Sequence, residues 1–346
     1  MMNTSDKTLV VVQLTGGNDF MNTIVPYTNQ HYFDARKKIV MDQSEVIPIN
    51  DSLAINKNAS SFKDIFDAGN MAIIQGIGYP NSNRSHFRGM DIWHTCEPDK
   101  VGNDGWLGLA LRELDPLAEN VLTGVNIGQG LPRAMAVSGV PVTSISDLET
   151  YGVMNSIERQ KLKEKSIQAF KDIYGQAIGS GKVSEYIGKT GLDVLKGADM
   201  LNEVAANYQS NVEYAENQIS NNLKDIARIH TSNLGTRIFY TSQGGYDTHA
   251  NELPTHPKLI RELSNAVSDF MDDLEEHNLS EDVLILVFTE FGRRMKDNGS
   301  GTDHGSGGGA FIIGDHVKGG LYSTYPRLDS KYWAKGEDLE HTIDFR

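Results

Sequence analysis

Short apolar runs and helical patterns alternate along the first part of the chain. Residues 8–14 form a nearly continuous β-branched run that ends at two glycines, as is typical of a strand buried on both faces of a sheet. Residues 61–68 carry apolar side chains at helical spacing, and Gly69 follows as a C-cap. A second strand is predicted over residues 71–77. This part of the sequence therefore predicts strands with a helix between them.

The same alternation returns near the other end of the chain. Strand-like runs over residues 236–241 and 282–289 enclose an amphipathic helix predicted over residues 257–277. A strand, a helix and a strand in this order imply parallel pairing of the two strands. The pattern predicts a layered α/β/α fold with a mostly parallel central sheet.

The stretch from about residue 155 to residue 230 has a different pattern. It is polar, with apolar residues at helical spacing that include Leu201, Val204 and Tyr208. We expect a helical insertion that packs beside the sheet and roofs the site. No Pro- or Ser-rich linker brackets it, which favours an integral layer of one domain spanning residues 1–346 over a separate substrate domain.

Charge and hydropathy exclude some classes of partner. The formal net charge is −14, so the field of the molecule would repel nucleic acid and anionic membranes. No apolar run approaches the ~20 residues of a membrane span. The start of the sequence lacks the pattern of a signal peptide, which predicts a cytoplasmic protein as written.

Polar clusters occur where predicted strands end or shortly beyond them. They comprise residues 16–19, 84–86, 244–249 and 289–294, and residues 302–305 precede a further predicted strand over 310–313. Ligands of open α/β sheets bind beyond the carboxyl ends of the strands. We therefore expect these residues to converge on one site.

The converging side chains are rich in carboxylates and imidazoles, which a divalent metal would stabilise by supplying positive charge. Such a mixed nitrogen and oxygen set suits one or two ions of Zn, Mn or Fe better than Ca or Mg. Each cluster also has an ordinary interpretation, because Gly-Gly-Asn-Asp is a turn sequence and a lone His is usually a hydrogen-bonding residue. The candidate metal ligands are Asp19, Asp247, His249, Glu290, Asp303 and His304.

Six ordered segments carry a family resemblance. On them, the sequence resembles the bacterial family catalogued as domain of unknown function 1501, which lies near the sulfatases in the alkaline-phosphatase superfamily. The segments are Leu14–Phe20, Gly78–Phe87 with Asp91–Trp93, Gly105–Gly108, Gly244–Asn251, Thr289–Arg294 and Gly301–Gly305.

The resemblance implies roles for particular residues. Asp19 corresponds to the superfamily's first-strand ligand, Asp247 and His249 to later ligands, and Glu290 and His304 to the last. Ser85 corresponds to a nucleophile that the metal activates. Ser82 stays open as an alternative nucleophile, since Asn81-Ser82 resembles the setting in cofactor-independent phosphoglycerate mutases. The arginines expected to clamp the non-bridging oxygens are Arg84, Arg293 and Arg294.

Two local departures bear on the number of metals. The superfamily's usual Asp-x-x-x-His appears here as Asp247-Thr248-His249, and its usual Asp-His pair appears as Glu290-Phe291. The leading expectation is a metal-dependent hydrolase or transferase of phosphate or sulfate esters, carried by small molecules or glycans. A binding or scaffold protein with a degenerate metal site is the alternative, and a metal-dependent isomerase or mutase is a third. Relatives often carry a twin-arginine signal, which implies an exported, periplasmic protein if such a signal has been removed.

Overall fold

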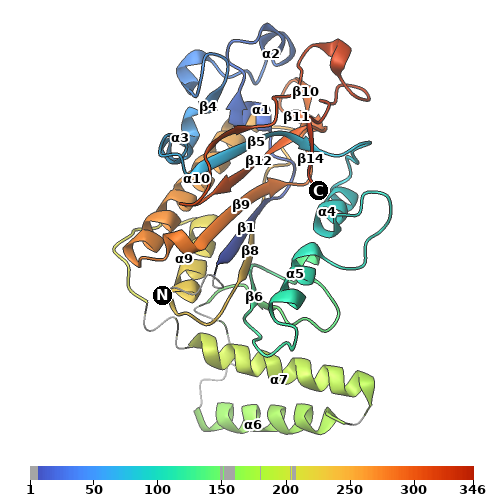
Figure 1. The fold of residues 1–346 in the computed structure, drawn as a ribbon, viewed down its shortest axis with the longest axis vertical. Coiled ribbons are helices and arrows are strands. Elements are labelled where there is room, and N and C mark those ends of the chain that lie inside the picture. Colours follow the sequence, from blue (N-terminus) through green and yellow to red (C-terminus); the bar gives the residue numbers. More distant parts are fainter. Residues whose placement is uncertain (1–6, 149–150, 152–159, 180, 203, 205–207) are drawn as a thin grey trace.

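The computed structural model describes residues 7–148, 151, 160–179, 181–202, 204 and 208–346. Within them, one large sheet has the strand order β13-β5-β12-β9-β1-β8-β6-β7, with β14 also paired to β5 (Figure 1). Its strands are β1 Thr8–Leu14, β5 Met71–Gly78, β6 Gly124–Ile127, β7 Thr143–Ile145, β8 Ile238–Gln243, β9 Val283–Thr289, β12 Gly308–Ile313, β13 Gly320–Tyr322 and β14 Ile343–Asp344.

Parallel pairing dominates this sheet. Strand β1 lies between β8 and β9 and pairs in parallel with both, so that Leu14 is opposite Gln243 on one side and Thr289 on the other. The three strands therefore end at the same edge. Only β12 among these strands runs antiparallel, and it pairs with both β5 and β9. The expected mostly parallel sheet is confirmed.

Helices cover both faces of the sheet and complete the three layers (Figure 1). Strand β1 shows why both faces are apolar, because Val10 and Val12 belong to one core cluster and Val11 belongs to the other. Burial of such side chains contributes about 1.5–3 kcal/mol each. Helices α3 Ser60–Asp67, α9 Gln218–Thr231 and α10 Glu252–Glu276 pack on the first face, and α4 His86–Thr95 and α5 Trp106–Leu114 pack on the second.

Smaller elements gather beyond the carboxyl edge of the sheet. They are α1 Phe20–Thr23, α2 Gln30–Ala35, a small sheet of β2 Ile24–Val25, β4 Ala54–Asn56 and β3 Val46–Pro48, and the hairpin of β10 Arg293–Asp297 and β11 Thr302–His304. Short 3-10 helices occupy Gln43–Glu45, Lys57–Ala59, Arg133–Met135, Ser280–Asp282 and Ser330–Tyr332.

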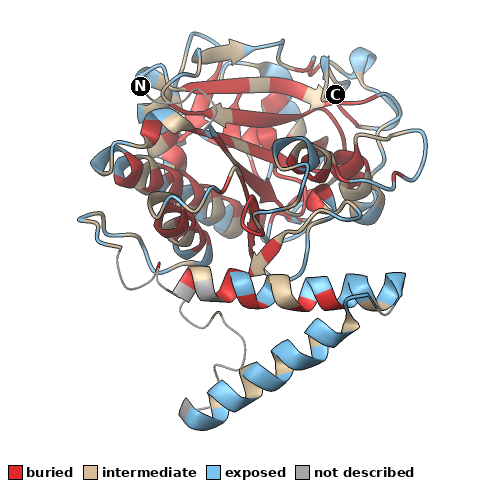
Figure 2. Ribbon diagram, turned by 60° about the horizontal axis from the view of Figure 1, so that its bottom comes forward, coloured by how far each residue is buried: buried red, intermediate tan, exposed pale blue. Residues whose placement is uncertain are grey.

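Most of the described part of the expected insertion is helical, while its first residues lie largely outside the described part of the chain. Helix α7 Lys182–Asn202 buries Leu195, Ala198 and Leu201, whereas α6 Gln160–Ala177 packs along α7 and is mostly exposed (Figure 2). Both helices lie at the end of the molecule opposite the α1–α2 elements (Figure 1). The carboxyl edge of the sheet faces those α1–α2 elements. The hairpin of α6 and α7 therefore does not roof the site, contrary to expectation.

The apolar spacing after Leu201 does not continue as one helix. Residues 208–217 form a loop in which the hydroxyl groups of Tyr208 and Tyr214 donate to the buried carboxylate of Asp273 on α10. Their rings face the core from a loop because this carboxylate requires hydrogen-bond donors. Helix α10 also begins five residues earlier than predicted, at Glu252, and Pro257 lies inside it. No helix among the described residues is long and apolar enough to cross a membrane.

Candidate metal centre

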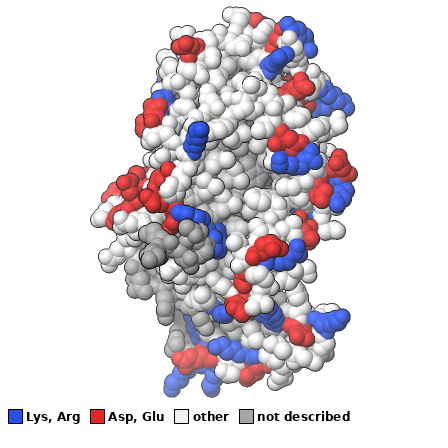
Figure 3. Space-filling view, in the orientation of Figure 1, with Lys and Arg blue, Asp and Glu red and all other residues white. Residues whose placement is uncertain are grey.

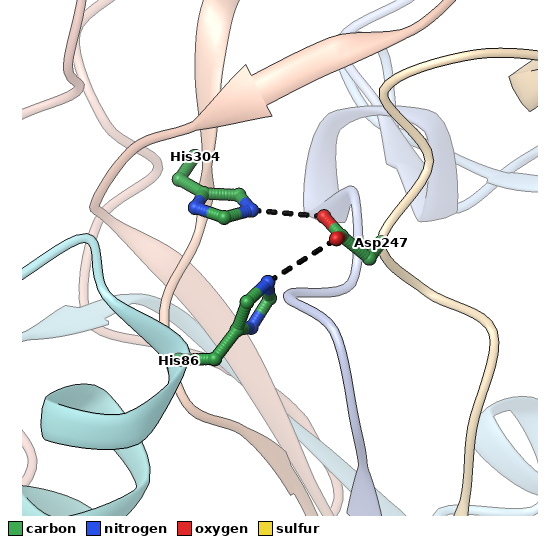
Figure 4. Close-up of side chains that lie close together, drawn as sticks. All are labelled: His86, Asp247 and His304. Atoms are coloured by element: carbon green, nitrogen blue, oxygen red, sulfur yellow. Dashed lines mark hydrogen bonds and ion pairs between the residues drawn. The ribbon is translucent and has the colours of Figure 1, made fainter.

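Three histidines and one aspartate meet beyond the carboxyl edge of the sheet. Nε2 of His304 lies 2.8 Å from Oδ1 of Asp247, and Nε2 of His86 lies 3.3 Å from Oδ2 of the same carboxylate (Figure 4). Nε2 of His249 lies 3.1 Å from Oδ1 of Asp247 and 2.9 Å from Nε2 of His304. Single ligand atoms from His86, Asp247 and His304 all lie within 4.8 Å of one another.

Different elements deliver these four side chains to one point. Asp247 and His249 lie in the loop after β8, His86 is the first residue of α4 in the segment after β5, and His304 ends β11. Gly16 lets the loop after β1 approach this site closely, since its φ is +123° and a Cβ there would lie 2.3 Å from the backbone nitrogen of Asp247. Asp247 and His249 thus lie where the sequence placed them, just beyond the carboxyl end of a strand.

The Nδ1 atom of each histidine is held by an oxygen that can only accept. In His86 it lies 2.8 Å from Oε1 of Glu290, in His249 3.1 Å from Oδ1 of Asp303, and in His304 2.8 Å from the carbonyl oxygen of Arg84. Nδ1 must therefore carry the proton in all three rings. In the neutral rings, the three Nε2 lone pairs then face the carboxylate of Asp247, and those of His249 and His304 also face each other. A proton or a cation between these atoms would stabilise the arrangement.

Electrostatics favour the metal-binding protonation states. Burial raises the pKa of Asp247, but the close approach of His304 and the hydrogen bond and charge of Arg293 outweigh it and hold the pKa well below its usual value. Desolvation lowers the pKa of His304 despite its bond to Asp247. A carboxylate anion beside a neutral imidazole is the form in which both groups bind metal.

These donors fit a divalent transition metal. Two imidazole nitrogens with one carboxylate, and a third imidazole beside them, form a set that Zn²⁺ accepts. Histidine ligands of metals usually have a second partner that holds the other ring nitrogen, as Nδ1 is held here. His86, Asp247 and His304 would hold the ion, and His249 lies beside Asp247 and His304 as a further donor. The ion would supply positive charge at a point where the side chains are partly exposed and a substrate can approach.

Of the six residues predicted as ligands, three contribute directly to this cluster: Asp247, His249 and His304. Glu290 and Asp303 lie one step further out and orient His86 and His249. The carboxylate of Glu290 is fully buried and also accepts from the backbone nitrogen of Gly16 at 2.9 Å.

Asp19 lies elsewhere. Its carboxylate is buried and forms an ion pair with the buried Arg36. Burial raises the pKa of Asp19, but Arg36 outweighs it and holds the pKa at about 2. Burial and the charge of Asp19 raise the pKa of Glu252 to about 9. Because the guanidinium of Arg36 neutralises its charge, we do not assign Asp19 as a metal ligand.

Glu252 connects the two segments that carry the metal-ligand candidates. Its Oε2 accepts from the hydroxyl of Thr248 at 3.2 Å and from that of Thr302 at 2.9 Å. Thr248 lies between Asp247 and His249 in the chain, and Thr302 lies two residues before His304. The carboxyl group therefore sets the distance between the two segments.

The three predicted arginines occupy two kinds of environment. Arg293 is buried, and it donates to the carbonyl oxygens of Gly16, Gly17, Tyr246 and Thr302 and to Asp247. Its hydrogen bonds connect the loops after β1 and β8 with strand β11, and its side chain does not face solvent. The side chains of Arg84 and Arg294 are about one-third exposed, and both approach Asp338, at 3.5 and 3.9 Å.

The two candidate serines lie on the segment between β5 and α4. Ser85 is exposed and is the N-cap residue of α4, where its side chain makes no capping bond. It lies between Arg84 and His86 in the chain. Ser82 is partly buried and lines both a small void beside Glu290 and a larger pocket beside Arg84.

Sequence reasoning missed three residues of this region. His86 was part of a recognised polar cluster at a strand end, and the rule that selected His249 applies to it equally. Arg36 and Glu252 carried no such signal, because each lies inside a helical or loop pattern far from the clusters in sequence and joins them only through packing.

The structure thus defines a three-layer α/β protein with a histidine and carboxylate cluster at the carboxyl edge of its sheet. The chain belongs to the family described as "Protein of unknown function (DUF1501)", whose model matches residues 104–344. This confirms the family expected from the six segments. No curated protein matches the chain.

Several solved structures are similar to the chain at low identity. The PsFucS1 sulfatase from Pseudoalteromonas sp. is 10% identical, with a TM-score of 0.41, over 93% of this chain and 65% of that one. Alkaline phosphatase from the Antarctic bacterium TAB5 is 12% identical, with a TM-score of 0.39, over 89% and 92%. The lipoteichoic acid synthase LtaP from Listeria monocytogenes is 7% identical, with a TM-score of 0.40, over 91% and 67%.

Proposed function

We propose that the chain is a metal-dependent hydrolase or transferase acting on phosphate or sulfate esters. The observation that carries the proposal is the convergence of three Nε2 atoms on the carboxylate of Asp247, with every Nδ1 held by an oxygen acceptor. A divalent ion bound there would act as a Lewis acid on the ester and neutralise charge on the transferring group.

The chain's own residues supply the remaining functions. The hydroxyl of Ser85 forms the new bond to phosphorus or sulfur and gives its proton to solvent, while the bond to the alcohol oxygen breaks and the alcohol leaves with a proton from solvent. Water, or a second alcohol in a transfer reaction, then attacks the group held on Ser85, which releases it and restores the serine hydroxyl. The exposed position of Ser85 at the N-terminus of α4 supports this role, since the helix end favours the developing anion. Arg84 and Arg294 bind the non-bridging oxygens, which their partial exposure allows.

We infer one ion rather than two. Arg36 neutralises Asp19, and Glu290 is engaged by His86 and Gly16, so neither carboxylate is directed at a second ion. The surface supports a small-molecule or glycan ester rather than nucleic acid, because charges of both signs are interspersed on the face in Figure 3.

Metal analysis and turnover test the proposal. Protein purified without chelators is expected to contain about one equivalent of divalent metal and to hydrolyse 4-nitrophenyl phosphate or 4-nitrophenyl sulfate. Ser85→Ala is expected to abolish turnover and to keep metal and fold, whereas Ser52→Ala, an exposed serine in a distant turn, should change neither.

Other outcomes would redirect the assignment. Full activity in Ser85→Ala would transfer the role to Ser82 or to water. Bound metal with no turnover of any ester would favour the alternative, a binding or scaffold protein, and absence of metal affinity would overturn the proposal.

A further inference from the structure

A polar pocket of about 400 Å³ lies beside the candidate metal centre. Arg84 belongs to both, because its carbonyl oxygen holds Nδ1 of His304 at 2.8 Å while its side chain lines the pocket. Ser82 and Ser306 line the pocket and also the small void next to Glu290. A group attached to an ester at the metal centre would therefore extend into this space.

Several hydrogen-bonding side chains in the pocket have no partner. Among the described residues, the side chains of Ser82, Lys335 and Glu340 form no hydrogen bond or ion pair, and Asp338 has only long contacts with Arg84 and Arg294. The lining therefore offers free donors and free acceptors in the same small volume.

The charges in the lining are balanced. Arg84 and Lys335 carry positive charge, and Asp338 and Glu340 carry negative charge. A second anionic group on the substrate would have no favourable interaction with the two carboxylates. An aromatic alcohol would offer no hydrogen-bonding groups to these donors and acceptors. A hydroxyl group both donates and accepts, so an alcohol with several hydroxyl groups can satisfy both kinds of side chain.

We propose that this pocket receives the alcohol part of the ester and that this alcohol is a polyol, such as a sugar or a cyclitol. The inference rests on the proposed function, and it assigns substrate choice to Lys335 and Glu340. Neither residue touches the candidate metal ligands.

Comparison of two ester classes tests the polyol pocket. The probes are glucose 6-phosphate and glucose 6-sulfate against 4-nitrophenyl phosphate and 4-nitrophenyl sulfate. The ratio of kcat/KM for the glucose ester to that for the aryl ester should fall about tenfold in Lys335→Ala and in Glu340→Gln, the value of one hydrogen bond to a charged group. Lys331→Ala, on the nearby surface and paired with Asp329, should leave the ratio unchanged.

A binding measurement separates this inference from the proposed function. Calorimetric titration of the folded Ser85→Ala protein with glucose 6-phosphate needs no turnover, and Lys335→Ala introduced into it should weaken that binding about tenfold. If the aryl esters are turned over but the ratio of kcat/KM values is unchanged in Lys335→Ala and Glu340→Gln, the polyol pocket is overturned. The proposed ester hydrolase or transferase activity would then still hold. Binding of glucose 6-phosphate that depends on Lys335, without turnover of any ester, would support the pocket and count against the esterase.

Discussion

Nε2 of His304 lies 2.8 Å from Oδ1 of Asp247, although neither atom has a proton to share when the imidazole is neutral. Nδ1 of the same ring is committed to a backbone carbonyl oxygen, so the tautomer cannot change to relieve the contact. In the proposed metal centre, a cation bound by both atoms would stabilise two acceptors held this close.

His86 should be required for metal binding. Its Nε2 is one of the three imidazole donors, and the ring has no other partner on that side. We expect His86→Ala to lower zinc affinity at least 100-fold, measured by competition with a chromophoric chelator, with little change in unfolding temperature in the absence of metal. His316→Ala removes an exposed histidine far from the cluster and serves as the matched control. Equal affinity in both variants would exclude His86 from the site.

Glu290 should act on the metal through His86. Its buried carboxylate holds Nδ1 of the ring and so fixes the orientation in which Nε2 faces Asp247. Glu290→Gln keeps the shape and removes the charge, and outer partners of this kind are worth about 10–100-fold in metal affinity. The exposed Glu281 provides the control, as Glu281→Gln. An affinity that stays within twofold of the native value would show that the carboxylate is only structural.

Metal affinity should fall with decreasing pH. Asp247 stays ionised, because its pKa lies well below the usual value, and therefore imidazole protonation controls the response. Desolvation lowers the pKa of His304, so this ring remains neutral below the ordinary histidine value of about 6.5. Zinc titrations should give a constant dissociation constant from pH 8 to about pH 7 and a steep rise below about pH 6. Unchanged affinity at pH 5 would contradict histidine ligation.

Arg293 should determine stability more than chemistry. Its guanidinium joins the loop after β1, the loop after β8 and strand β11 by five hydrogen bonds in a fully buried position. An ammonium group cannot match this planar set of donors, and we expect Arg293→Lys to cost about 3 kcal/mol in the free energy of unfolding. Arg294→Lys, at a partly exposed position, should cost less than about 1 kcal/mol by chemical denaturation. Similar losses in the two variants would show that the burial of Arg293 carries no special weight.

Glu252 should make stability depend on pH in the opposite direction from a salt-bridged carboxylate. Its folded pKa is about 9, so the native state keeps a proton that the unfolded chain releases above about pH 4.5. The free energy of unfolding should therefore decline as pH rises from about 5 to 9, by at most about 1.4 kcal/mol per pH unit from this group. Glu252→Gln should remove that decline, which thermal unfolding at several pH values can measure. A parallel decline in the variant would assign it to other groups.

Local patterns in the sequence carried much of this architecture. The runs that form β1, β5 and β9 are so apolar that both of their faces must be buried, which requires helices on both sides of the sheet. A helix that connects two parallel strands crosses the sheet with a fixed handedness, so the layered arrangement could be predicted. The direction of β12 was not visible, because parallel and antiparallel strands share one apolar pattern. The strand-end rule selected Asp247 and His249 for the same reason that it selected Asp19.

Tertiary structure decided which of these residues meet. Asp19 and Asp247 both follow buried strands, but Asp19 forms a buried ion pair with Arg36. Nothing in the sequence near either aspartate indicates that only one of them has such a partner. The partners that fix each Nδ1 come from as far as 220 residues away, as Arg84 does for His304. The sequence by itself determined that acidic and imidazole groups would collect at one edge of a sheet, because strand ends place them there. Which of these groups face the candidate metal centre, and which only orient the others by hydrogen bonds, depends on tertiary structure. Buried charge pairs and ring orientations decide it, and both form only when distant segments pack together.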